Sequence, residues 1–217
     1  GKRTKIATET PSFPRKRIVS SSKSADLKDQ EMDVVFSPEL TVCGIEELPD
    51  QRARNVTHVL SLLDPELPEL EAFQTYGKHH RTTLRFHDII VAAPERVMPR
   101  PDHVETILAF GQDFLARQEA QPRSHLLVHC HMGVSRSTAA MLTLMAQANP
   151  DEEAESLFTR LVAIRPQAWP NSQMIGFADE QLGRKGDLTA ALGRHYGRQI
   201  RNRPQFTDWM TQLGRQA

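Results

Sequence analysis

The sequence has little cysteine and no long apolar run. Only two of its 217 residues are cysteines, which excludes a disulfide framework and fits a reducing, cytoplasmic compartment. No apolar stretch approaches the roughly 18 residues that a membrane-spanning helix needs. The N-terminal segment also lacks the apolar region of a secretory signal. We therefore expect a cytoplasmic protein without a membrane partner.

An excess of charge of either sign is missing as well. The 27 Lys and Arg residues balance 27 Asp and Glu residues, so the net charge gives no general argument for binding nucleic acid. Basic residues do gather in residues 1–33, a segment without hydrophobic periodicity that we interpret as a flexible basic leader. Aromatic side chains that could stack on bases do not alternate with these charges, so we predict no nucleic-acid partner.

Short runs rich in β-branched and aliphatic residues predict four buried strands, at 40–44, 56–62, 82–86 and 125–128. Helices are predicted between and after them, at 46–55, 102–118, 150–165, 172–182, 187–201 and 205–213. Asn149 is expected to cap the helix that starts at Pro150. The alternation of strands and helices predicts an α/β fold with a central mixed, largely parallel sheet flanked by helices.

The stretch LLVHCHMGVSRSTAAM, residues 126–141, places a cysteine where a buried strand ends and a helix of small residues begins. At such a junction, backbone N–H groups and the positive end of the helix dipole converge on one point. We therefore expect an anion-binding nest around the Cys130 sulfur, in which Gly133 permits a positive φ. The predicted phosphate-binding residues are His131, Met132, Gly133, Val134, Ser135 and Arg136.

The residue types in this stretch suit phosphoryl transfer. A cysteine acts as a nucleophile through its thiolate. Arg136 has a planar guanidinium that can bind two phosphate oxygens at once. This geometry favours in-line transfer of a phosphoryl group to Cys130, followed by hydrolysis of the covalent intermediate by water. Ser137 is placed to hydrogen-bond the sulfur and His129 to fix the loop. Because Arg136 and the amides supply positive charge, we expect no metal and no other cofactor.

The run HCHMGVSRS, residues 129–137, resembles the signature loop of cysteine-dependent protein phosphatases, and its GVSRS part is closest to the dual-specificity branch. Two further segments resemble the same family, NVTHVLSL at 55–62 and IRPQAWPNSQM at 164–174. The combination also resembles a group of predicted bacterial tyrosine phosphatases. The resemblance implies a dual-specificity phosphatase-like domain at 34–183, and we expect a helical C-terminal extension at 184–217 to pack on it.

The same resemblance implies hydrolysis of phosphate monoesters on a phosphorylated protein or peptide, with tyrosine or dual specificity. No Lys or Arg lies between Cys130 and Arg136 to favour a multiply charged inositol phosphate. Two alternatives stay open, a phosphate-binding module without turnover (a pseudophosphatase) and a sulfurtransferase, which also uses a cysteine in an amide-lined loop. The Arg-Ser ending of the loop favours a phosphatase over a sulfurtransferase.

The leaving oxygen of a phosphate ester needs a proton, which the family resemblance assigns to an Asp in a loop upstream of the cysteine. The usual distance falls at Met98–Pro99, where there is no acid, so the sequence departs from the family pattern. This departure supports the pseudophosphatase alternative. The candidates lie in or beside a proline-rich loop predicted at 88–101. Asp88 is favoured because it follows the third strand directly, whereas Glu95 lies in mid-loop and Asp102 is explained as a helix cap.

Three histidines lie close to Cys130 in the sequence, namely His125, His129 and His131. They could suggest a metal site, but a metal on the cysteine would compete with its role as nucleophile, so we expect none. Cys43 is expected to be a buried packing residue, with a reversible disulfide that protects Cys130 as the alternative. Asn171 is expected to cap a helix, and orienting a loop beside the pocket is a possible second role.

Overall fold

A four-stranded parallel sheet forms the centre of the fold. The structure, a computed structural model, describes residues 38–118, 123–205 and 208. Its strands are β1 (Glu39–Cys43), β2 (His58–Leu63), β3 (His80–Arg85) and β4 (His125–His129), in the spatial order β1-β4-β2-β3. Every neighbouring pair is parallel, so all four strands end at the same edge of the sheet. The predicted α/β class is confirmed, and the sheet is wholly parallel over the described strands rather than mixed.

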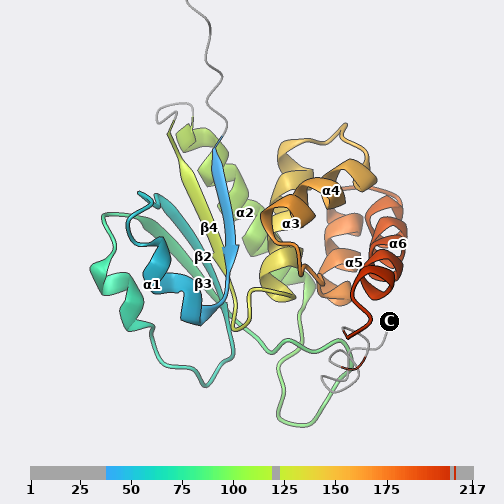
Figure 1. Cartoon of the computed structure of the whole chain (residues 1–217), viewed down its shortest axis with the longest axis horizontal. Helices are drawn as coiled ribbons and strands as arrows, with labels where there is room; N and C mark the ends of the chain where they lie inside the picture. Colours follow the sequence, from blue (N-terminus) through green and yellow to red (C-terminus); the bar gives the residue numbers. More distant parts are fainter. Residues whose placement is uncertain (1–37, 119–122, 206–207, 209–217) are drawn as a thin grey trace, which may run out of the picture. The chain divides into compact units, whose positions relative to one another are not determined.

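Helices cover the two faces of the sheet unequally (Figure 1). One face carries α2 (Pro101–Gln118), α3 (Arg136–Ala148), α4 (Ala154–Ile164), α5 (Ser172–Gln181) and α6 (Asp187–Asn202). The other face carries the short α1 (Leu48–Gln51) and two 3-10 turns, η1 (Ile45–Glu47) and η2 (Glu71–Thr75). Among the described residues, no helix is both long and apolar enough to cross a bilayer.

Two predicted helices differ from the structure. The helix expected over 46–55 is shorter and consists of η1 followed by α1. The helix expected to start at Pro150 begins at Ala154, because Asn149 ends α3 and its Nδ2 donates to the carbonyl of Met145 at 2.8 Å. Pro150 thus directly follows a helix C-cap, where proline is common. The leader predicted at 1–33 lies outside the described residues, as does most of the helix predicted at 205–213.

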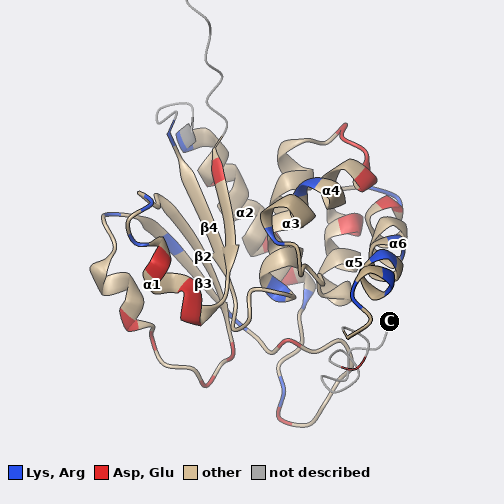
Figure 2. Cartoon of the chain, viewed as in Figure 1, with Lys and Arg blue, Asp and Glu red and all other residues tan. Residues whose placement is uncertain are grey.

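Helix α3 lies at the centre of the larger hydrophobic core. Of its 13 residues, 11 are buried. Small side chains such as Ala139 and Ala140 let α2, α4 and α5 pack around it. The strand that precedes it, β4, is completely buried and carries no Lys, Arg, Asp or Glu (Figure 2). The junction of β4 with α3 therefore joins a fully buried strand to a mostly buried helix.

Helix α6 fastens the segment that follows α4. Tyr196 stacks on Trp169 with ring centroids 4.2 Å apart, and the Gln199 Nε2 donates to the carbonyl of Ala168 at 3.0 Å. The backbone N–H of Trp169 in turn donates to the carbonyl of Val134 at 2.8 Å, in the loop between β4 and α3. The C-terminal helix therefore supports that loop indirectly. The domain boundaries at 34, 183 and 184 stay a prediction.

Candidate active site

The loop that joins β4 to α3 turns its carbonyl groups outward. Five consecutive carbonyl oxygens accept hydrogen bonds: His131 from Ile45 N (3.0 Å), Met132 from Arg165 Nη2 (3.1 Å), Gly133 from Arg165 Nε (2.9 Å), Val134 from Trp169 N (2.8 Å) and Ser135 from Ala139 N (2.9 Å). A trans peptide unit directs its N–H away from its C=O. The N–H groups of residues 132–136 therefore point to the inner side of the loop. This arrangement is the backbone nest that the sequence predicts around Cys130.

Gly133 is required for this loop on two grounds. Its φ is +67°, a left-handed conformation that side chains rarely adopt. A Cβ atom added at this position would lie 2.4 Å from the carbonyl carbon of Cys43 and 2.5 Å from the nitrogen of Gly44. The loop therefore packs directly on the backbone at the end of β1, which leaves no room for a side chain.

Arg165 holds the outer side of the loop through two of the carbonyls named above. Its guanidinium also forms a two-pronged ion pair with Glu47, at 2.8 and 2.7 Å. This pair lowers the pKa of the Glu47 carboxyl, whose Oε2 also accepts from the Gly44 N–H at 2.6 Å. One arginine thus ties together the segments after β1, after β4 and after α4. Neither Arg165 nor Glu47 was predicted as a site residue.

Cys130 begins the loop and is 1% exposed. Its Sγ lies 3.1 Å from the Oγ of Ser137, the contact expected from the sequence. Ser137 is fully buried in the first turn of α3, so its hydroxyl is fixed beside the sulfur. The inward N–H groups and the positive end of α3 favour a bound anion at this point.

Arg136 is buried and is held along one edge. Its Nη1 donates to the carbonyl of Phe86 at 2.5 Å and lies 2.7 Å from Oδ1 of Asp64. Its Nε is buried and has no hydrogen-bond partner within the described part of the chain. Two acceptors thus fix Nη1 and leave Nε as a donor for a ligand.

Asp64 is a residue of the site that the sequence analysis missed. It directly follows β2, and the loop with Arg136 follows β4, the strand that pairs with β2. Residues after neighbouring parallel strands meet at the same edge of the sheet, where ligands commonly bind. This placement was the available signal for Asp64.

Asp88 reaches the same place from the end of β3. Its Oδ1 accepts from the Ser135 Oγ at 2.7 Å and from the Asn171 Nδ2 at 3.0 Å, and its Oδ2 lies 3.8 Å from the Arg136 Nε. Asn171 also caps α5, because its Oδ1 accepts from the Met174 N–H at 3.2 Å. Both roles considered for Asn171, helix cap and orientation of the loop, therefore have their contacts in the structure.

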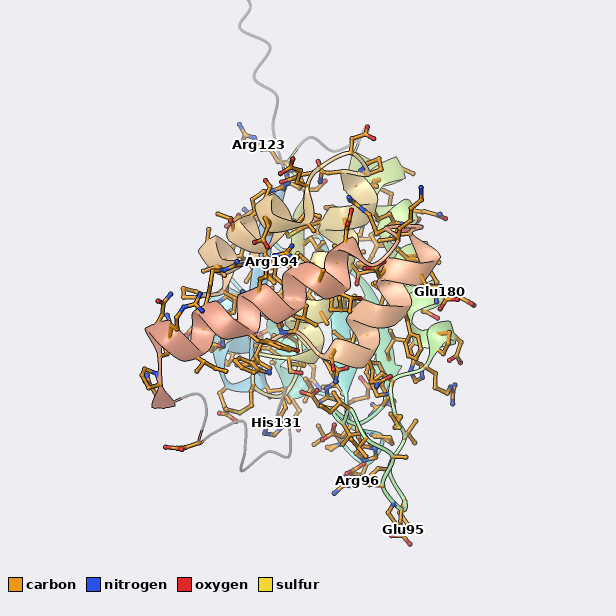
Figure 3. The ribbon with its side chains drawn as sticks, turned by 90° about the vertical axis from the view of Figure 1, so that its right-hand side faces the viewer. Glu95, Arg96, Arg123, His131, Glu180 and Arg194 are labelled. Carbon is orange, nitrogen blue, oxygen red and sulfur yellow. The ribbon has the colours of Figure 1, made fainter. Side chains whose placement is uncertain are left out.

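The other two candidate acids lie elsewhere. Glu95 is exposed at the outer end of the 88–101 loop, as Figure 3 shows. Asp102 lies in the first turn of α2 and pairs with Arg100, at 2.9 and 2.5 Å, which lowers the pKa of its carboxyl to about 2. Of the three candidates, only Asp88 is brought to Arg136.

These groups surround a cavity of about 240 Å³. The residues that line it are Asp64, His87, Asp88, Ile89, Arg96, His131, Met132, Val134, Ser135 and Arg136. The side chains of His131 and Met132 are exposed, so they border the opening rather than the floor. The structure therefore brings the predicted loop, Arg136 and Asp88 together around one cavity.

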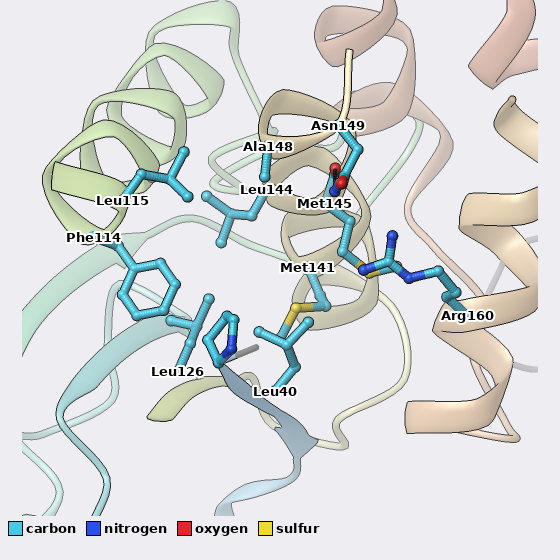
Figure 4. A pocket seen from close by; sticks show the side chains of 12 residues that line it. Leu40, Phe114, Leu115, Leu126, Met141, Leu144, Met145, Ala148, Asn149 and Arg160 are labelled. Atoms are coloured by element: carbon cyan, nitrogen blue, oxygen red, sulfur yellow. Dashed lines mark hydrogen bonds between the residues drawn. The ribbon is translucent and has the colours of Figure 1, made fainter. Parts of the chain in front are cut away.

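A second cavity of about 250 Å³ lies between α2, α3 and the start of β1 (Figure 4). Its lining is mostly apolar and includes Phe114, Leu126, Met141 and Leu144, with Arg160 at one side. It contains no nucleophile and no carboxylate. We therefore place the candidate chemistry at the cavity lined by Asp64, Asp88 and Arg136.

Two of the three histidines near Cys130, His125 and His129, are held by other polar groups. His129 Nε2 bonds to the Ser61 Oγ at 2.7 Å, and burial lowers the pKa of His129 to about 3. His129 therefore links β4 to β2 rather than fixing the loop directly. His125 contacts Thr41 and the carbonyl of Arg54, at 2.8 and 2.9 Å. No group of three metal-binding side chains occurs among the described residues.

No protein-family model and no curated protein matches the sequence. Solved structures do match. A mouse putative dual specificity phosphatase, determined with zinc tungstate, is 16% identical over 76% of this chain and 98% of its own, with a TM-score of 0.50. The PTP-2 phosphatase of Cydia pomonella is 19% identical over 65% and 84%, and a variant of human DUSP28 is 19% identical over 69% and 95%, each with a TM-score of 0.50. The chain has the α/β fold of dual-specificity and tyrosine phosphatase domains.

Proposed function

We propose that the protein hydrolyses phosphate monoesters through a phosphocysteine intermediate on Cys130. One observation carries this proposal. A loop with five outward carbonyls encloses the cysteine, and Arg136 and Asp88 border the cavity at that loop. Inward N–H groups and a guanidinium suit the oxygens of a phosphate, and a carboxyl group beside them suits proton transfer.

In the first step, the phosphate oxygens accept hydrogen bonds from the loop N–H groups and from Arg136. The Cys130 thiolate attacks phosphorus, the bond from phosphorus to the ester oxygen breaks, and Asp88 gives its proton to that leaving oxygen. In the second step, Asp88 takes a proton from water, which attacks phosphorus and breaks the S–P bond. Ser137, at 3.1 Å, stabilises the thiolate that leaves.

We propose a phosphorylated protein or peptide as the substrate, with tyrosine or dual specificity. The wall of the cavity includes the apolar Ile89 and Met132, and none of the side chains from His131 to Ser135 is a Lys or Arg. An apolar wall favours the ring of an aryl phosphate over a polar sugar.

We also propose a reducing, cytoplasmic compartment for the protein. Cys43 and Cys130 are both free thiols, which is the state that such a compartment maintains.

The pseudophosphatase alternative relied on the unusual distance between the acid and the cysteine. Asp88 lines the cavity despite that distance, and this placement supports turnover over phosphate binding alone. A sulfurtransferase would need no proton donor for an ester oxygen, so the placement of Asp88 favours a phosphatase.

Hydrolysis of p-nitrophenyl phosphate tests the proposal. We would compare the wild type with Cys130→Ser, with a chelator present, from acidic to mildly alkaline pH. Turnover that disappears in Cys130→Ser supports a cysteine phosphatase. If the wild type is inactive but binds vanadate, and Arg136→Ala abolishes that binding, the protein is a phosphate-binding module. Thiosulfate-dependent sulfur transfer to cyanide would instead identify a sulfurtransferase.

A further inference from the structure

We propose that His87 is a positioning residue that closes the loop 88–96 and thereby holds Asp88 in the cavity. The proposal rests on the proposed phosphatase function and adds a residue through which its acid acts. In this proposal the loop does not have to move during catalysis, because the Asp88 carboxyl group is already in the cavity before the substrate binds.

The closure consists of two hydrogen bonds between His87 and Val97. The backbone N–H of His87 donates to the carbonyl of Val97 at 2.8 Å. The N–H of Val97 donates back to the His87 Nδ1, also at 2.8 Å. Nine residues, 88–96, therefore lie in a loop whose two ends are joined at His87, and Asp88 is the first residue inside it.

The hydrogen bond from the Val97 N–H to Nδ1 also determines which nitrogen of the His87 ring carries the proton. Since Nδ1 accepts a hydrogen bond, the neutral ring carries its proton on Nε2. Nε2 lies 3.1 Å from Oε2 of Glu66, which can accept that proton's hydrogen bond. The His87 side chain is 7% exposed and that of Glu66 is 60% exposed. The buried bond to Val97 should therefore matter more than the solvated bond to Glu66.

Side chains from the start of α5 hold the root of the loop, next to Asp88. Asn171 Nδ2 donates to the carbonyl of Ile89 at 3.3 Å, and Gln173 Nε2 donates to that of Ile90 at 3.2 Å. Residues 91–96 are exposed, and Glu95 lies at the outer end of the loop (Figure 3). The contacts thus concentrate on the residues next to Asp88. Proton transfer depends on alignment within hydrogen-bond reach, so this is where rigidity would matter.

Two nearly isosteric variants test the role of Nδ1. His87→Asn places an acceptor near Nδ1, whereas His87→Gln places its amide near Nε2 and leaves the Val97 N–H unpaired. We expect His87→Gln to lower kcat/KM for phenyl phosphate roughly tenfold, the effect of one lost buried hydrogen bond. For dinitrophenyl phosphate, whose leaving group needs no proton, the loss should be small. His87→Asn should restore most of the activity, and the control Glu66→Gln should have little effect.

Trypsin gives a second readout that needs no activity. Arg96 is half exposed, and the peptide bond after it contains the Val97 N–H that His87 binds. We expect His87→Gln to speed cleavage at this bond and His87→Asn to slow it toward the wild-type rate. This readout applies even if a variant loses stability, because cleavage at other sites reports global unfolding.

The outcomes separate the two proposals. If the wild type is no more active than Cys130→Ser, the proposed function fails. If the wild type is active but His87→Gln slows both esters equally, His87 shapes the cavity generally and does not act through Asp88. If His87→Asn lowers kcat/KM for phenyl phosphate as much as His87→Gln does, the loss of the Nδ1 acceptor does not explain the lower activity. Either of the last two results overturns the inference about His87 alone.

Discussion

The two cysteines occupy matching places at the ends of neighbouring strands, but the chain continues differently after each. Cys43 ends β1, and Cys130 follows the last residue of the neighbouring β4. Both are buried, with 2% and 1% of their surface exposed, so exposure does not distinguish them. After Cys130 the chain forms a loop of inward N–H groups, whereas after Cys43 it forms η1, which carries Glu47. The difference in reactivity that we propose between the two cysteines therefore comes from the residues that follow each of them.

The surroundings of Cys43 oppose ionisation. Its side chain packs with Leu48 and Phe73 in the smaller core, while Cys130 belongs to the larger core on the other face of the sheet. Burial, followed by the charge of Glu47, raises the pKa of Cys43 to about 12. The two thiols lie on different faces, which argues against the protective disulfide and for a packing role for Cys43.

The largest expected contrast is between substitutions of these two cysteines. Cys130→Ser should abolish turnover, because a serine hydroxyl is a weak nucleophile without an adjacent base. Cys43→Ala should retain most of the activity, because its side chain lies on the opposite face. Initial rates with p-nitrophenyl phosphate measure both. A comparable loss in Cys43→Ala would show that the two strand ends are not as different as proposed.

The next contrast is between Asp88, whose carboxyl group we expect to transfer a proton, and Asp64, whose carboxylate only holds Arg136 in place. Asp88→Asn should lower kcat/KM for phenyl phosphate by about 100-fold or more and have much less effect with dinitrophenyl phosphate, because only the first leaving group needs a proton. Asp64→Asn should lower both by a similar factor of about tenfold, because it weakens the hold on Arg136. A leaving-group dependence for Asp64→Asn would instead identify Asp64 as the acid.

A third contrast tests how the Cys130 loop packs on the end of β1. Gly133 and Gly183 both have positive φ, at +67° and +64°, but an added Cβ clashes only at Gly133. Gly183→Ala should cost about 1–3 kcal/mol of unfolding free energy, the usual strain of that conformation. Gly133→Ala should cost more and should also reduce activity. Urea unfolding measures the difference, and equal costs would mean that the close packing contributes nothing.

The smallest effect is a pH dependence at Cys43. Its pKa is raised in the folded state, so above about pH 9 the thiol ionises only in the unfolded state, which lowers stability as pH rises toward 12. Between pH 7 and 10 the wild type should therefore lose about 1–2 kcal/mol more unfolding free energy than Cys43→Ala. Identical slopes for the two proteins would contradict the assigned environment of Cys43.

The sequence predicted the parts of the fold that depend on local patterns. The four strands, the loop after β4 and Asp88 could be placed because each is marked by nearby residues. The prediction that Asn149 caps the following helix was wrong. Five residues separate α3 from α4, and a capping residue in that segment suits the end of one helix as well as the start of the next. Glu47 could not be found, since its partner Arg165 lies 118 positions away and only the folded chain joins them. Asp64 and the His87–Val97 closure depend in the same way on how the strand ends meet.

The central claim is a covalent phosphocysteine at Cys130, and trapping it is the most direct test. Asp88→Asn mixed with dinitrophenyl phosphate should form the intermediate without an acid but hydrolyse it slowly, so the phosphoenzyme should accumulate. Acid quenching followed by peptide mass spectrometry would locate the phosphate. We expect phosphate on the peptide that contains Cys130 and none in Cys130→Ser. Two results would contradict the claim. One is rapid turnover by the wild type with no phosphate on Cys130 in the wild type or in Asp88→Asn, and the other is phosphate on a different residue.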